Sequence, residues 1–464
     1  MEQMMIDHDD TIAAISTPLG EGGIAIVRLS GPASVSIIRK VFRGKKDVQK
    51  NSDKQIYHGW IVDKNEPIDE VLLTLFHAPH SYTGEDVVEV NCHGGVFVSR
   101  RILELLIQNG ARPAEPGEFT QRGFFHGRID LSQAEAVADL VRAKTEAARR
   151  VAVYQLEGRL SSRLKEIREQ LIKACSLLEI ELDFSEENIT FVSRKEIVSL
   201  LRETRREIQI FLGSFDRGKV CREGIRMAIV GRPNVGKSSI LNSLVERERA
   251  IVTEIPGTTR DTVEDVLDIH GILFTVTDMA GIRETQDPVE QKSVLRAMKA
   301  IDMSDLVLLV FDGSENLNIE DEMIVRRVKD MKKQVMVVVN KIDLEQKIDN
   351  RQLERWMSGM KLHCVSAVSR EGFPELIRAV EEAVLSDGLP HEGEVVITRA
   401  RHRHCIVRCA KLIRKAEVSL RKGMSQEFIA LDLKGALDAL GEITGQTVTD
   451  DILSRIFSEF CVGK

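Results

Sequence analysis

Residues 231–238 match the pattern G-x-x-x-x-G-K-[ST] at every fixed position, and this pattern is typical of a loop that binds a phosphate chain. Apolar residues 227–230 precede the loop and predict a buried strand, while the apolar spacing of residues 239–244 predicts the start of a helix. Glycines at both ends let the backbone turn its N–H groups toward phosphate oxygens at the helix N-terminus. Lys237 is expected to reach the β- and γ-phosphates, and Ser238 to bind Mg²⁺. The stretch therefore predicts a nucleotide site.

A second stretch, residues 340–343, identifies the base. It follows the apolar run 335–339, so it is expected at the carboxyl end of a buried strand, where ligands bind in open α/β sheets. The carboxylate of Asp343 can accept hydrogen bonds from N1–H and N2–H₂ of guanine. Adenine has no N1 proton and would leave buried acceptors unpaired, which costs about 1–3 kcal/mol per group. Residues 366–368 follow another short strand and offer a backbone N–H to guanine O6, so the nucleotide is expected to be GTP.

A third motif, D-x-x-G at residues 278–281, follows an expected strand at 272–277. Asp278 is expected in the Mg²⁺ shell, and the N–H of Gly281 is expected to meet the γ-phosphate. The four motifs in this order predict a GTPase domain. The residues expected to contact GTP are Gly231, Asn234, Val235, Gly236, Lys237, Ser238, Ser239, Thr253, Glu254, Ile255, Pro256, Gly257, Thr258, Thr259, Asp278, Met279, Ala280, Gly281, Asn340, Lys341, Ile342, Asp343, Ser366, Ala367 and Val368.

The hydrolytic machinery departs from the Ras pattern. Ras-type enzymes place a glutamine after the D-x-x-G glycine to orient water, and this chain has Ile282 there. Several carboxylates in residues 283–290 can serve instead, and the residues alone do not choose among them. No arginine finger is identifiable from spacing, whereas Asn234 and the loop 253–259 offer oxygen atoms for a monovalent cation.

The phosphate loop combines with two terminal motifs, D-T-I-A-A at residues 10–14 and F-C-V-G-K at residues 460–464. Together they resemble the MnmE (TrmE) family of tRNA modification GTPases, and the resemblance runs essentially from end to end. It implies that Glu290 is the catalytic glutamate. Met279 stands where the family usually carries Thr, but the Asp and Gly of that motif are kept.

The resemblance also implies two metal ions beside the nucleotide. Thr259 is expected to bind Mg²⁺ next to Ser238. K⁺ is expected to bind the side chain of Asn234, the carbonyls of Thr253 and Ile255, and the hydroxyl of Thr258.

Residues 10–125 are expected to form a mixed α/β domain. Alternating residues predict a strand at 24–29, and further strands are expected at 70–76 and 86–92, with a helix at 100–108. By resemblance this domain binds a tetrahydrofolate derivative (5-formyl- or methylene-tetrahydrofolate). The contacts expected for it are Arg28, Glu85, Arg128 and Lys464, and Arg128 stands where some relatives have Lys. Cys92 and His93 are also adjacent here, but neighbouring strand residues point to opposite faces, which argues against a nucleophile pair.

Helical sequence begins near residue 126. Capping boxes are expected at 132–135 and 193–196, a leucine-rich stripe at 156–182, and a helix stop at Gly213. The fold class is thus α/β plus α: an N-terminal folate-binding and dimerisation domain, and a Ras-like, mainly parallel GTPase domain inserted in a helical domain. Helical sequence is expected to resume after residues 386–390. The expected boundaries are 1–125 for the first domain, 126–223 and 387–464 for the helical domain, and 224–386 for the GTPase domain.

The last segment is rich in cations: Arg399, Arg401, Arg403, Arg408, Lys411, Arg414, Lys415, Arg421 and Lys422. These residue types fit an RNA contact or a solvated helix face, and the sequence does not choose between them. Cys461, close to the C-terminus, is either a nucleophile or part of a segment positioned near the folate, and the second interpretation is favoured because no general base is identifiable nearby in sequence.

Length and composition limit the number of domains, the kinds of partner and the cellular compartment. The length of 464 residues suggests about three domains. A net charge of −7 argues against bulk attraction to nucleic acid, so an RNA site requires a local basic face. No apolar run approaches the roughly 18 residues of a membrane span, residues 1–10 lack a signal-peptide core, and seven dispersed cysteines suit a reducing compartment. A cytoplasmic protein without a membrane partner is expected.

The resemblance implies a homodimer that works on tRNA with the FAD-containing partner MnmG (GidA), which alone carries the FAD. K⁺-dependent GTP hydrolysis would drive addition of an aminomethyl or carboxymethylaminomethyl-type group to C5 of the wobble uridine, using a tetrahydrofolate one-carbon unit. Two alternatives remain: a regulatory GTPase, such as a ribosome-assembly switch without modification chemistry, and a stand-alone folate-dependent methyltransferase.

Overall fold

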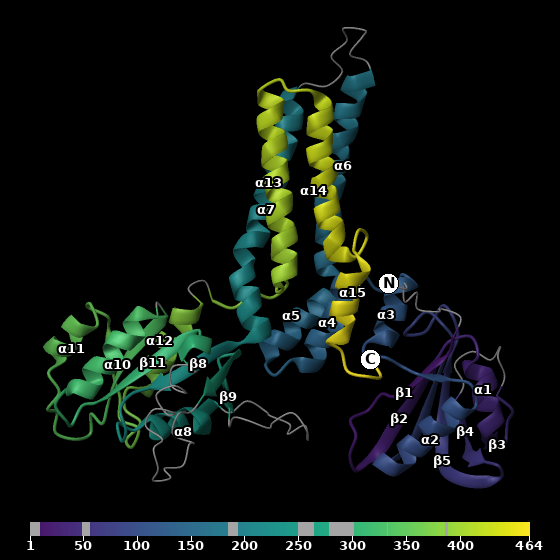
Figure 1. Ribbon diagram of the computed structural model, residues 1–464, viewed down its shortest axis with the longest axis horizontal. Coiled ribbons are helices and arrows are strands. Elements are labelled where there is room, and N and C mark those ends of the chain that lie inside the picture. The colour runs from purple at the N-terminus through teal and green to yellow at the C-terminus, as the bar shows by residue number, and fades with distance from the viewer. Residues whose placement is uncertain are drawn as a thin grey trace. The chain divides into compact units, whose positions relative to one another are not determined.

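The computed structural model describes residues 10–48, 56–183, 194–248, 264–277, 301–331, 333–385 and 388–464 (Figure 1). The chain divides into two compact units. One comprises Met1–Ala138, Leu156–Ile172 and Leu431–Lys464, and the other comprises Asp139–Gln155 and Lys173–Ala430. Helices α4 (Leu131–Arg142), α6 (Arg159–Asp183) and α14 (Gln426–Thr444) contain residues of both.

The first unit contains a seven-stranded sheet with the order β3-β4-β5-β6-β2-β1-β7. All neighbours are antiparallel except β1 and β7, which are parallel. The strands are β1 (Ile12–Ile15), β2 (Gly22–Ser30), β3 (Phe42–Gly44), β4 (Ile56–Asp63), β5 (Glu66–Phe76), β6 (Val87–Gly94) and β7 (Arg112–Pro113). The predicted strands and the helix at 100–108 are confirmed.

Helices α1 (Ser34–Val41) and α2 (Val96–Gln108) cover one face of this sheet. Their apolar residues pack on Ala25, Val27 and Leu29, the inward-pointing set of β2. On the same strand Ile24 is 67% exposed, as the period of two predicts. The face opposite the two helices is therefore exposed around Ile24, whereas near β1 Phe119 and Tyr82 cover it.

The remaining helices of the first unit show where capping was misjudged. Helix α4 begins at Leu131, so Ser132 is inside it. The carboxylate of Asp130 accepts from the N–H of Gln133 at 3.0 Å, and the Gln133 amide oxygen accepts from the N–H of Asp130 at 3.0 Å. The capping box at 132–135 was thus wrong by two positions, because Asp caps as well as Ser does. Helices α3 (Glu118–Phe125) and α15 (Asp450–Ser458) complete this unit.

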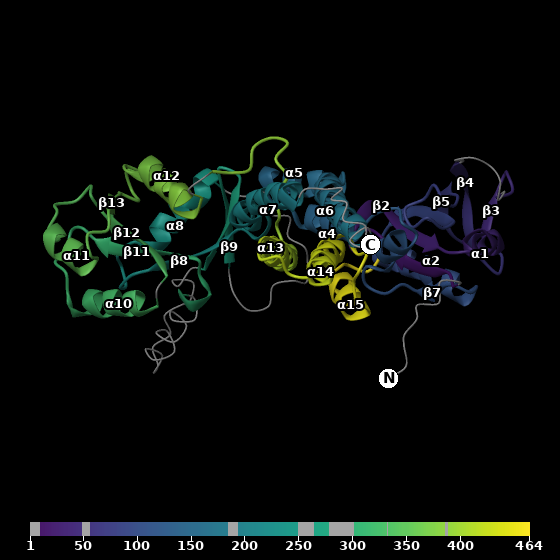
Figure 2. The ribbon, with the colours of Figure 1, turned by 90° about the horizontal axis from the view of Figure 1, so that it is seen from above.

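The second unit contains a six-stranded sheet with the order β13-β12-β11-β8-β10-β9. Its strands are parallel except for β9, which runs antiparallel to β10. They are β8 (Ile225–Val230), β9 (Glu264–Ile269), β10 (Ile272–Thr277), β11 (Leu306–Asp312), β12 (Gln334–Asn340) and β13 (Leu362–Cys364). Helices α8 (Lys237–Glu248) and α12 (Phe373–Val384) pack on one face, and α10 (Ile319–Asp330) and α11 (Asn350–Trp356) on the other (Figure 2). The mainly parallel sheet that the sequence predicted is confirmed, and helices on both of its faces make it a doubly wound α/β fold.

Helices α5 (Glu146–Leu156), α7 (Arg194–Glu223) and α13 (Ala400–Arg421) flank this sheet in sequence. Helix α7 runs through Gly213 and ends before Gly224, so the predicted stop was wrong: one exposed glycine weakens a helix but does not end it. Helix α13 starts at Ala400, ten residues after Pro390 and later than expected, and it packs on α7. The six-stranded domain is therefore inserted between two helices that contact each other. Within the described residues no helix is long and apolar enough to cross a membrane.

Candidate nucleotide-binding site

The loop 231–238 joins β8 to α8, as its motif predicted. A side chain at Gly231 would meet the carbonyl of Val310, and one at Gly236, whose φ is +94°, would meet the amide of Asn340. The two glycines are thus required by close packing and backbone conformation. The loop ends at the N-terminus of α8, where unpaired N–H groups favour an anion.

The side chain of Lys237 lies across this loop. Its Nζ donates to the carbonyls of Gly231 at 3.1 Å and Arg232 at 2.8 Å. Both contacts hold the ammonium group within the turn that precedes α8. The cation therefore lies where the expected phosphates would bind.

Asn340 brings three of the predicted motifs together. Its side chain is buried at the end of β12, where Nδ2 donates to the Val235 carbonyl at 2.9 Å. Its Oδ1 accepts from the N–H of Ala367 at 3.1 Å. Ser243 of α8 adds a second link, since its hydroxyl donates to the Ala367 carbonyl at 3.1 Å. The phosphate loop and the segments 340–343 and 366–368 consequently meet at the carboxyl edge of the sheet.

Lys341 and Asp312 form an ion pair at the same edge, with Nζ and Oδ2 2.5 Å apart. Burial raises the pKa of the Asp312 carboxyl, but hydrogen bonds from Lys341 and Ser314 outweigh this and leave the pKa below its ordinary value. The sequence interpretation missed Asp312. Its position at the end of the apolar strand β11 was the available signal, because polar residues that follow buried strands line this edge.

Asp343 and Ser366 have different surroundings. Asp343 is exposed next to Lys341, with its carboxylate accessible to a base. Ser366 is fully buried, and its hydroxyl accepts from the N–H of Val368 at 3.3 Å and of Ser369 at 3.0 Å. These hydrogen bonds form a tight turn at 366–369, which holds the backbone N–H of Ala367 next to the side chain of Asn340.

The other predicted residues of this site lie outside the described residues. They are the loop Thr253, Glu254, Ile255, Pro256, Gly257, Thr258 and Thr259, the motif Asp278, Met279, Ala280 and Gly281, and Glu290.

A second cluster of predicted residues lies in the first unit. The guanidinium of Arg28 stands 5.4 Å from the ring centre of Tyr82 and that of Arg128 stands 5.6 Å from the same ring. Arg28 also pairs with Glu89 at 2.8 Å and donates to the carbonyl of Gly463 at 3.4 Å. The structure therefore brings together Arg28, Arg128 and the C-terminal tail that holds Lys464. Tyr82 between the two arginines was not singled out from the sequence.

Glu85 is buried beside this cluster. Its carboxylate accepts from the hydroxyl of Ser30 at 2.6 Å and from Arg122 at 3.1 Å. A hydrogen-bonded carboxylate at a fixed place can receive N–H groups of a ligand. Removal of Glu85 would also leave the buried Arg122 with one partner fewer, so this position tests structure as well as binding.

Cys92 and His93 do not form a pair. Cys92 is buried, and burial raises the pKa of its thiol to about 11. The ring of His93 is exposed and bonds to Asp69 at 2.7 Å.

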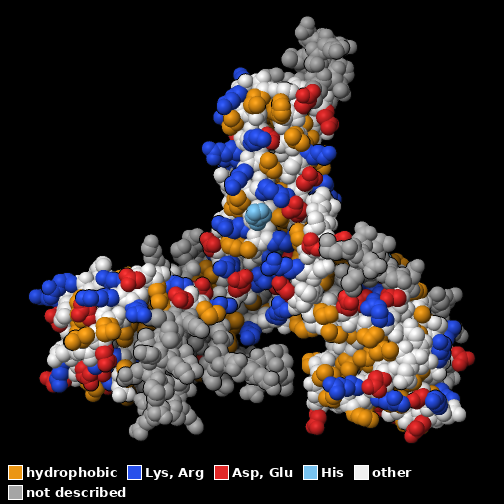
Figure 3. Space-filling view, viewed as in Figure 1, with side chains coloured by type: hydrophobic (Ala, Val, Ile, Leu, Met, Phe, Trp, Pro, Cys, Tyr) orange, Lys and Arg blue, Asp and Glu red, His pale blue; other side chains and the backbone are white. Residues whose placement is uncertain are grey.

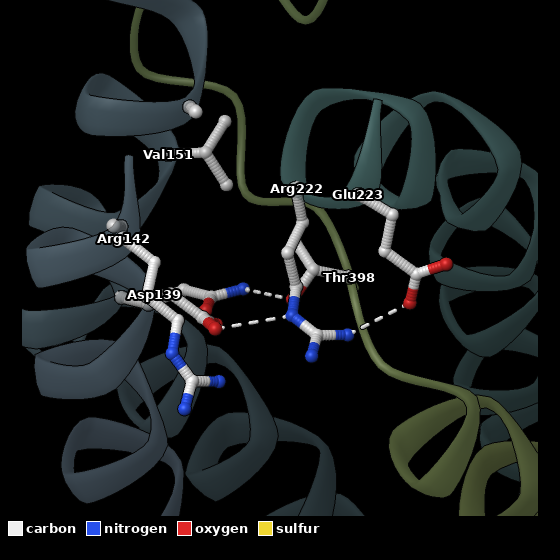
Figure 4. A pocket seen from close by; sticks show the side chains of 9 residues that line it. Asp139, Arg142, Val151, Arg222, Glu223 and Thr398 are labelled. Carbon is white, nitrogen blue, oxygen red and sulfur yellow. Dashed lines mark hydrogen bonds and ion pairs between the residues drawn. The ribbon is translucent and has the colours of Figure 1, made fainter. Parts of the chain in front are cut away.

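A polar pocket within the second unit ties together the two connections of the inserted domain (Figure 4). The carboxylate of Asp139 accepts from Arg222, near the end of α7, at 3.1 Å and from Arg399, before α13, at 2.7 Å. Gln155 donates to the hydroxyl of Thr398 at 3.2 Å. Side chains of α4 and α5 thus hold the chain where it enters and where it leaves the six-stranded domain.

The comparisons with known proteins match this chain over nearly its whole length. The family described as MnmE helical domain matches residues 131–461, and the family described as GTP-binding protein TrmE N-terminus matches residues 11–128. The chain belongs to the MnmE (TrmE) family. A tRNA modification GTPase MnmE from Natranaerobius thermophilus is 43% identical over 458 residues, which is 98% of this chain and 100% of that protein. MnmE proteins from Alkaliphilus metalliredigens and Clostridioides difficile are 44% and 41% identical, each over 98% of this chain and 99% of the relative.

MnmE membership makes this chain a GTPase of tRNA modification, with the P-loop fold and the nucleotide and Mg²⁺ requirement that such enzymes share. The P-loop, helical and TrmE-type N-terminal parts that the sequence predicted are all present.

Proposed function

We propose that this MnmE-family chain hydrolyses GTP at the edge of the six-stranded sheet and uses that reaction to drive wobble-uridine modification in tRNA. The observation that carries the first half is the double hydrogen bond of Asn340, which joins the phosphate loop to the guanine-side segments. In this assignment Lys237 and the loop N–H groups hold the phosphates, Ser238, Thr259 and Asp278 hold Mg²⁺, and Asp343 reads guanine.

A K⁺ ion is proposed beside the γ-phosphate. Of its four ligands only Asn234 lies among the described residues, where it is exposed on the phosphate loop with a φ of +64°. An amide oxygen held there fits a hard monovalent cation, and Thr253, Ile255 and Thr258 would supply the other oxygens. The ion would add positive charge to a site in which no arginine finger was identified. Glu290 is proposed to orient the attacking water.

The cation assignment is tested by GTP turnover in K⁺ and in Na⁺ at equal ionic strength. Turnover should fall in Na⁺, while equal rates would refute a K⁺ site. Glu290→Ala should lower turnover with little loss of GTP affinity, and Glu290→Gln serves as the isosteric control.

The N-terminal domain is proposed to bind a reduced folate. Support comes from two guanidinium groups on one tyrosine ring, a buried carboxylate at Glu85 and the adjacent tail with Lys464. The cations suit the folate's glutamate carboxylates, and the carboxylate suits the pterin N–H groups. Methylene-tetrahydrofolate would supply the one-carbon unit, and the FAD-containing partner MnmG would complete the chemistry at C5 of uridine.

Titration of the purified chain with 5-formyl-tetrahydrofolate tests this assignment. Arg28→Ala and Arg128→Ala should each weaken binding, and Arg101→Ala, which breaks an ion pair with Asp63 on the same domain, should not. If the wild-type chain has no affinity, the N-terminal part of the proposal fails and a regulatory GTPase without modification chemistry is the remaining interpretation.

A homodimer is supported by the exposed part of the seven-stranded sheet's face opposite α1 and α2. Cross-strand register places Ile24, Ile56, Trp60 and Leu72 on this face, and they are 67%, 68%, 45% and 46% exposed. Large apolar side chains exposed together on one sheet face support an interface between subunits.

Coupling between the sites is proposed to pass through the polar pocket. Docking of two GTPase domains around K⁺ would order residues 253–259, and the contacts of Asp139 with Arg222 and Arg399 would carry the movement into the helical domain.

We propose the domain boundaries 1–125, 126–223, 224–386 and 387–464, and a cytoplasmic location. The end of α7 at Glu223 supports the boundary before the GTPase domain.

A further inference from the structure

Helix α13 carries a row of exposed cations on one side. They recur at spacings of three, seven and eight residues, which keeps them on one face of a helix with 3.6 residues per turn. The exposed members are Arg403, Lys411, Arg414, Lys415 and Arg421, and Lys422 follows at the C-cap. We call this set the α13 basic face. Lys and Arg side chains gather along this helix in Figure 3.

The acidic residue of α13 does not neutralise this face. Glu417 is 3% exposed and points inward, where it pairs with Arg205 of α7 at 2.9 Å and reaches Arg421 at 3.8 Å. In the part of the chain that the structure describes, no carboxylate lies within ion-pair distance of Lys411, Arg414 or Lys422. These three charges are therefore open to a partner.

Three other predicted cations, Arg399, Arg401 and Arg408, are not exposed members of the face. Arg399 is 11% exposed and pairs with Asp139, so it holds the helical domain together. Arg408 lies at the edge of the same face, seven residues before Lys415, but is half-buried. Of the basic residues between 399 and 422, the exposed cations that can meet a partner are thus those of the α13 basic face.

We infer that the α13 basic face binds the phosphate backbone of tRNA. This inference rests on the proposed function, in which tRNA is the substrate. The whole chain has a net charge of −7, so its overall charge does not attract a polyanion. Any attraction must come from a local basic surface such as this one. From Arg403 to Lys422 the face extends about 28 Å at 1.5 Å per residue, which is long enough to meet several phosphates.

The composition of the face favours RNA over an acidic protein. Protein interfaces centre on aromatic and apolar anchors, whereas the exposed apolar residue among these cations is Val418, at 41%. The imidazole of His404 is exposed beside Arg403, and a single ring of this kind can stack on one base. The cations are suited to contact phosphates and to orient the tRNA more than to read its sequence.

The test measures binding of unmodified tRNA to the full chain over a salt series. The variant Lys411→Ala/Arg414→Ala/Lys422→Ala should bind tRNA about tenfold more weakly. Its plot of log affinity against log salt should be shallower by about two to three, because each lost phosphate contact removes 0.7–0.9 from the slope. GTP turnover should be unchanged.

A matched control removes three exposed cations from the GTPase domain: Arg351→Ala/Lys361→Ala/Arg378→Ala. It should bind tRNA within about twofold of wild type. Equal loss in both variants would show that net charge alone matters and would overturn the inference. Normal tRNA binding by the α13 variant would also overturn it, and loss of a protein partner in that case would reassign the face to an acidic protein. If the wild-type chain itself binds no tRNA, the proposed function fails together with this inference.

Discussion

The side-chain amide of Asn340 donates to the carbonyl of Val235 at 2.9 Å and so connects strand β12 to the phosphate loop. We predict that Asn340→Ala weakens both GTP binding and stability. The change leaves the Val235 carbonyl and the Ala367 N–H without their partner, at about 1–3 kcal/mol per group. Thermal unfolding with and without GTP measures both effects. Asn350→Ala, at the exposed start of α11, is the control and should behave as wild type.

Gly213 stands exposed in the middle of α7, with open space around the position of a Cβ. Gly213→Ala should therefore stabilise the helical domain by up to about 1 kcal/mol, since Ala favours the helix. Gly218→Ala in the same helix is the opposite case, because its Cβ would clash with the Ile397 carbonyl. A rise in melting temperature for the first variant and a fall for the second are expected. A fall in both would mean that α7 is strained at Gly213.

A buried charge network should make the N-terminal domain sensitive to acid. Burial raises the pKa values of Asp10 and Glu118, but hydrogen bonds from Arg112 and Arg122 outweigh it and leave both pKa values lowered. Carboxyls with lowered pKa values stabilise the fold at neutral pH, and this contribution is lost as pH falls below their ordinary values of about 4. Protection factors for amide hydrogen exchange in β1 and β2, in which the pH dependence of the intrinsic exchange rate is divided out, should fall in that range. Constant protection factors down to pH 3 would contradict the network's role.

Replacement of Arg122, the central cation of this network, should strongly lower the stability of the N-terminal domain at neutral pH. Arg122 is 1% exposed and pairs with Asp10, Glu85 and Glu118. Arg122→Met takes from the buried Glu85 the cation it pairs with and removes one of two arginine partners from Asp10 and from Glu118, so it should destabilise the domain by about 3–5 kcal/mol. Arg149→Met is the control: its pair with Glu146 is exposed to solvent, so its loss should have little effect on stability. Similar exchange rates in the two variants would count against the network.

Cys461 is exposed, and its carbonyl accepts from the N–H groups of Gly117 at 3.4 Å and Lys464 at 3.3 Å. These are backbone contacts, which serine would keep. If the tail positions the folate site, Cys461→Ser should retain folate affinity and tRNA modification, and deletion of residues 461–464 should reduce both. A nucleophilic role predicts loss of modification in Cys461→Ser with normal folate binding.

Structural features that depend on residues close together in the sequence could be predicted from it. The alternation of β2, the loop between β8 and α8, and the apolar strand before Asn340 were all predictable, because each depends on period or on a short motif. The cap of α4 was assigned to the wrong residue because two capping signals overlap within six positions, and only packing selects Asp130. Gly213 misled for a related reason: tertiary contacts of α7 with α13 outweigh the propensity of one residue.

Long-range contacts escaped the sequence interpretation. Tyr82 lies between Arg28 and Arg128, and Asp312 pairs with Lys341, yet nothing in the spacing of these residues links them. Likewise, the basic run at 399–422 gave no sign of which cations face inward. Arg399 was separated from the others only by its contact with Asp139, 260 residues away in the chain.

The assignment of Asp343 as the residue that reads guanine is tested most directly by Asp343→Asn. The amide of Asn can pair with xanthine, which carries a carbonyl at C2, but it no longer accepts two hydrogen bonds from guanine. Turnover of GTP and of xanthosine triphosphate by wild type and variant should be measured side by side. The preference for GTP should reverse in favour of xanthosine triphosphate in the variant. Unchanged hydrolysis of GTP by the variant would contradict the proposed nucleotide site.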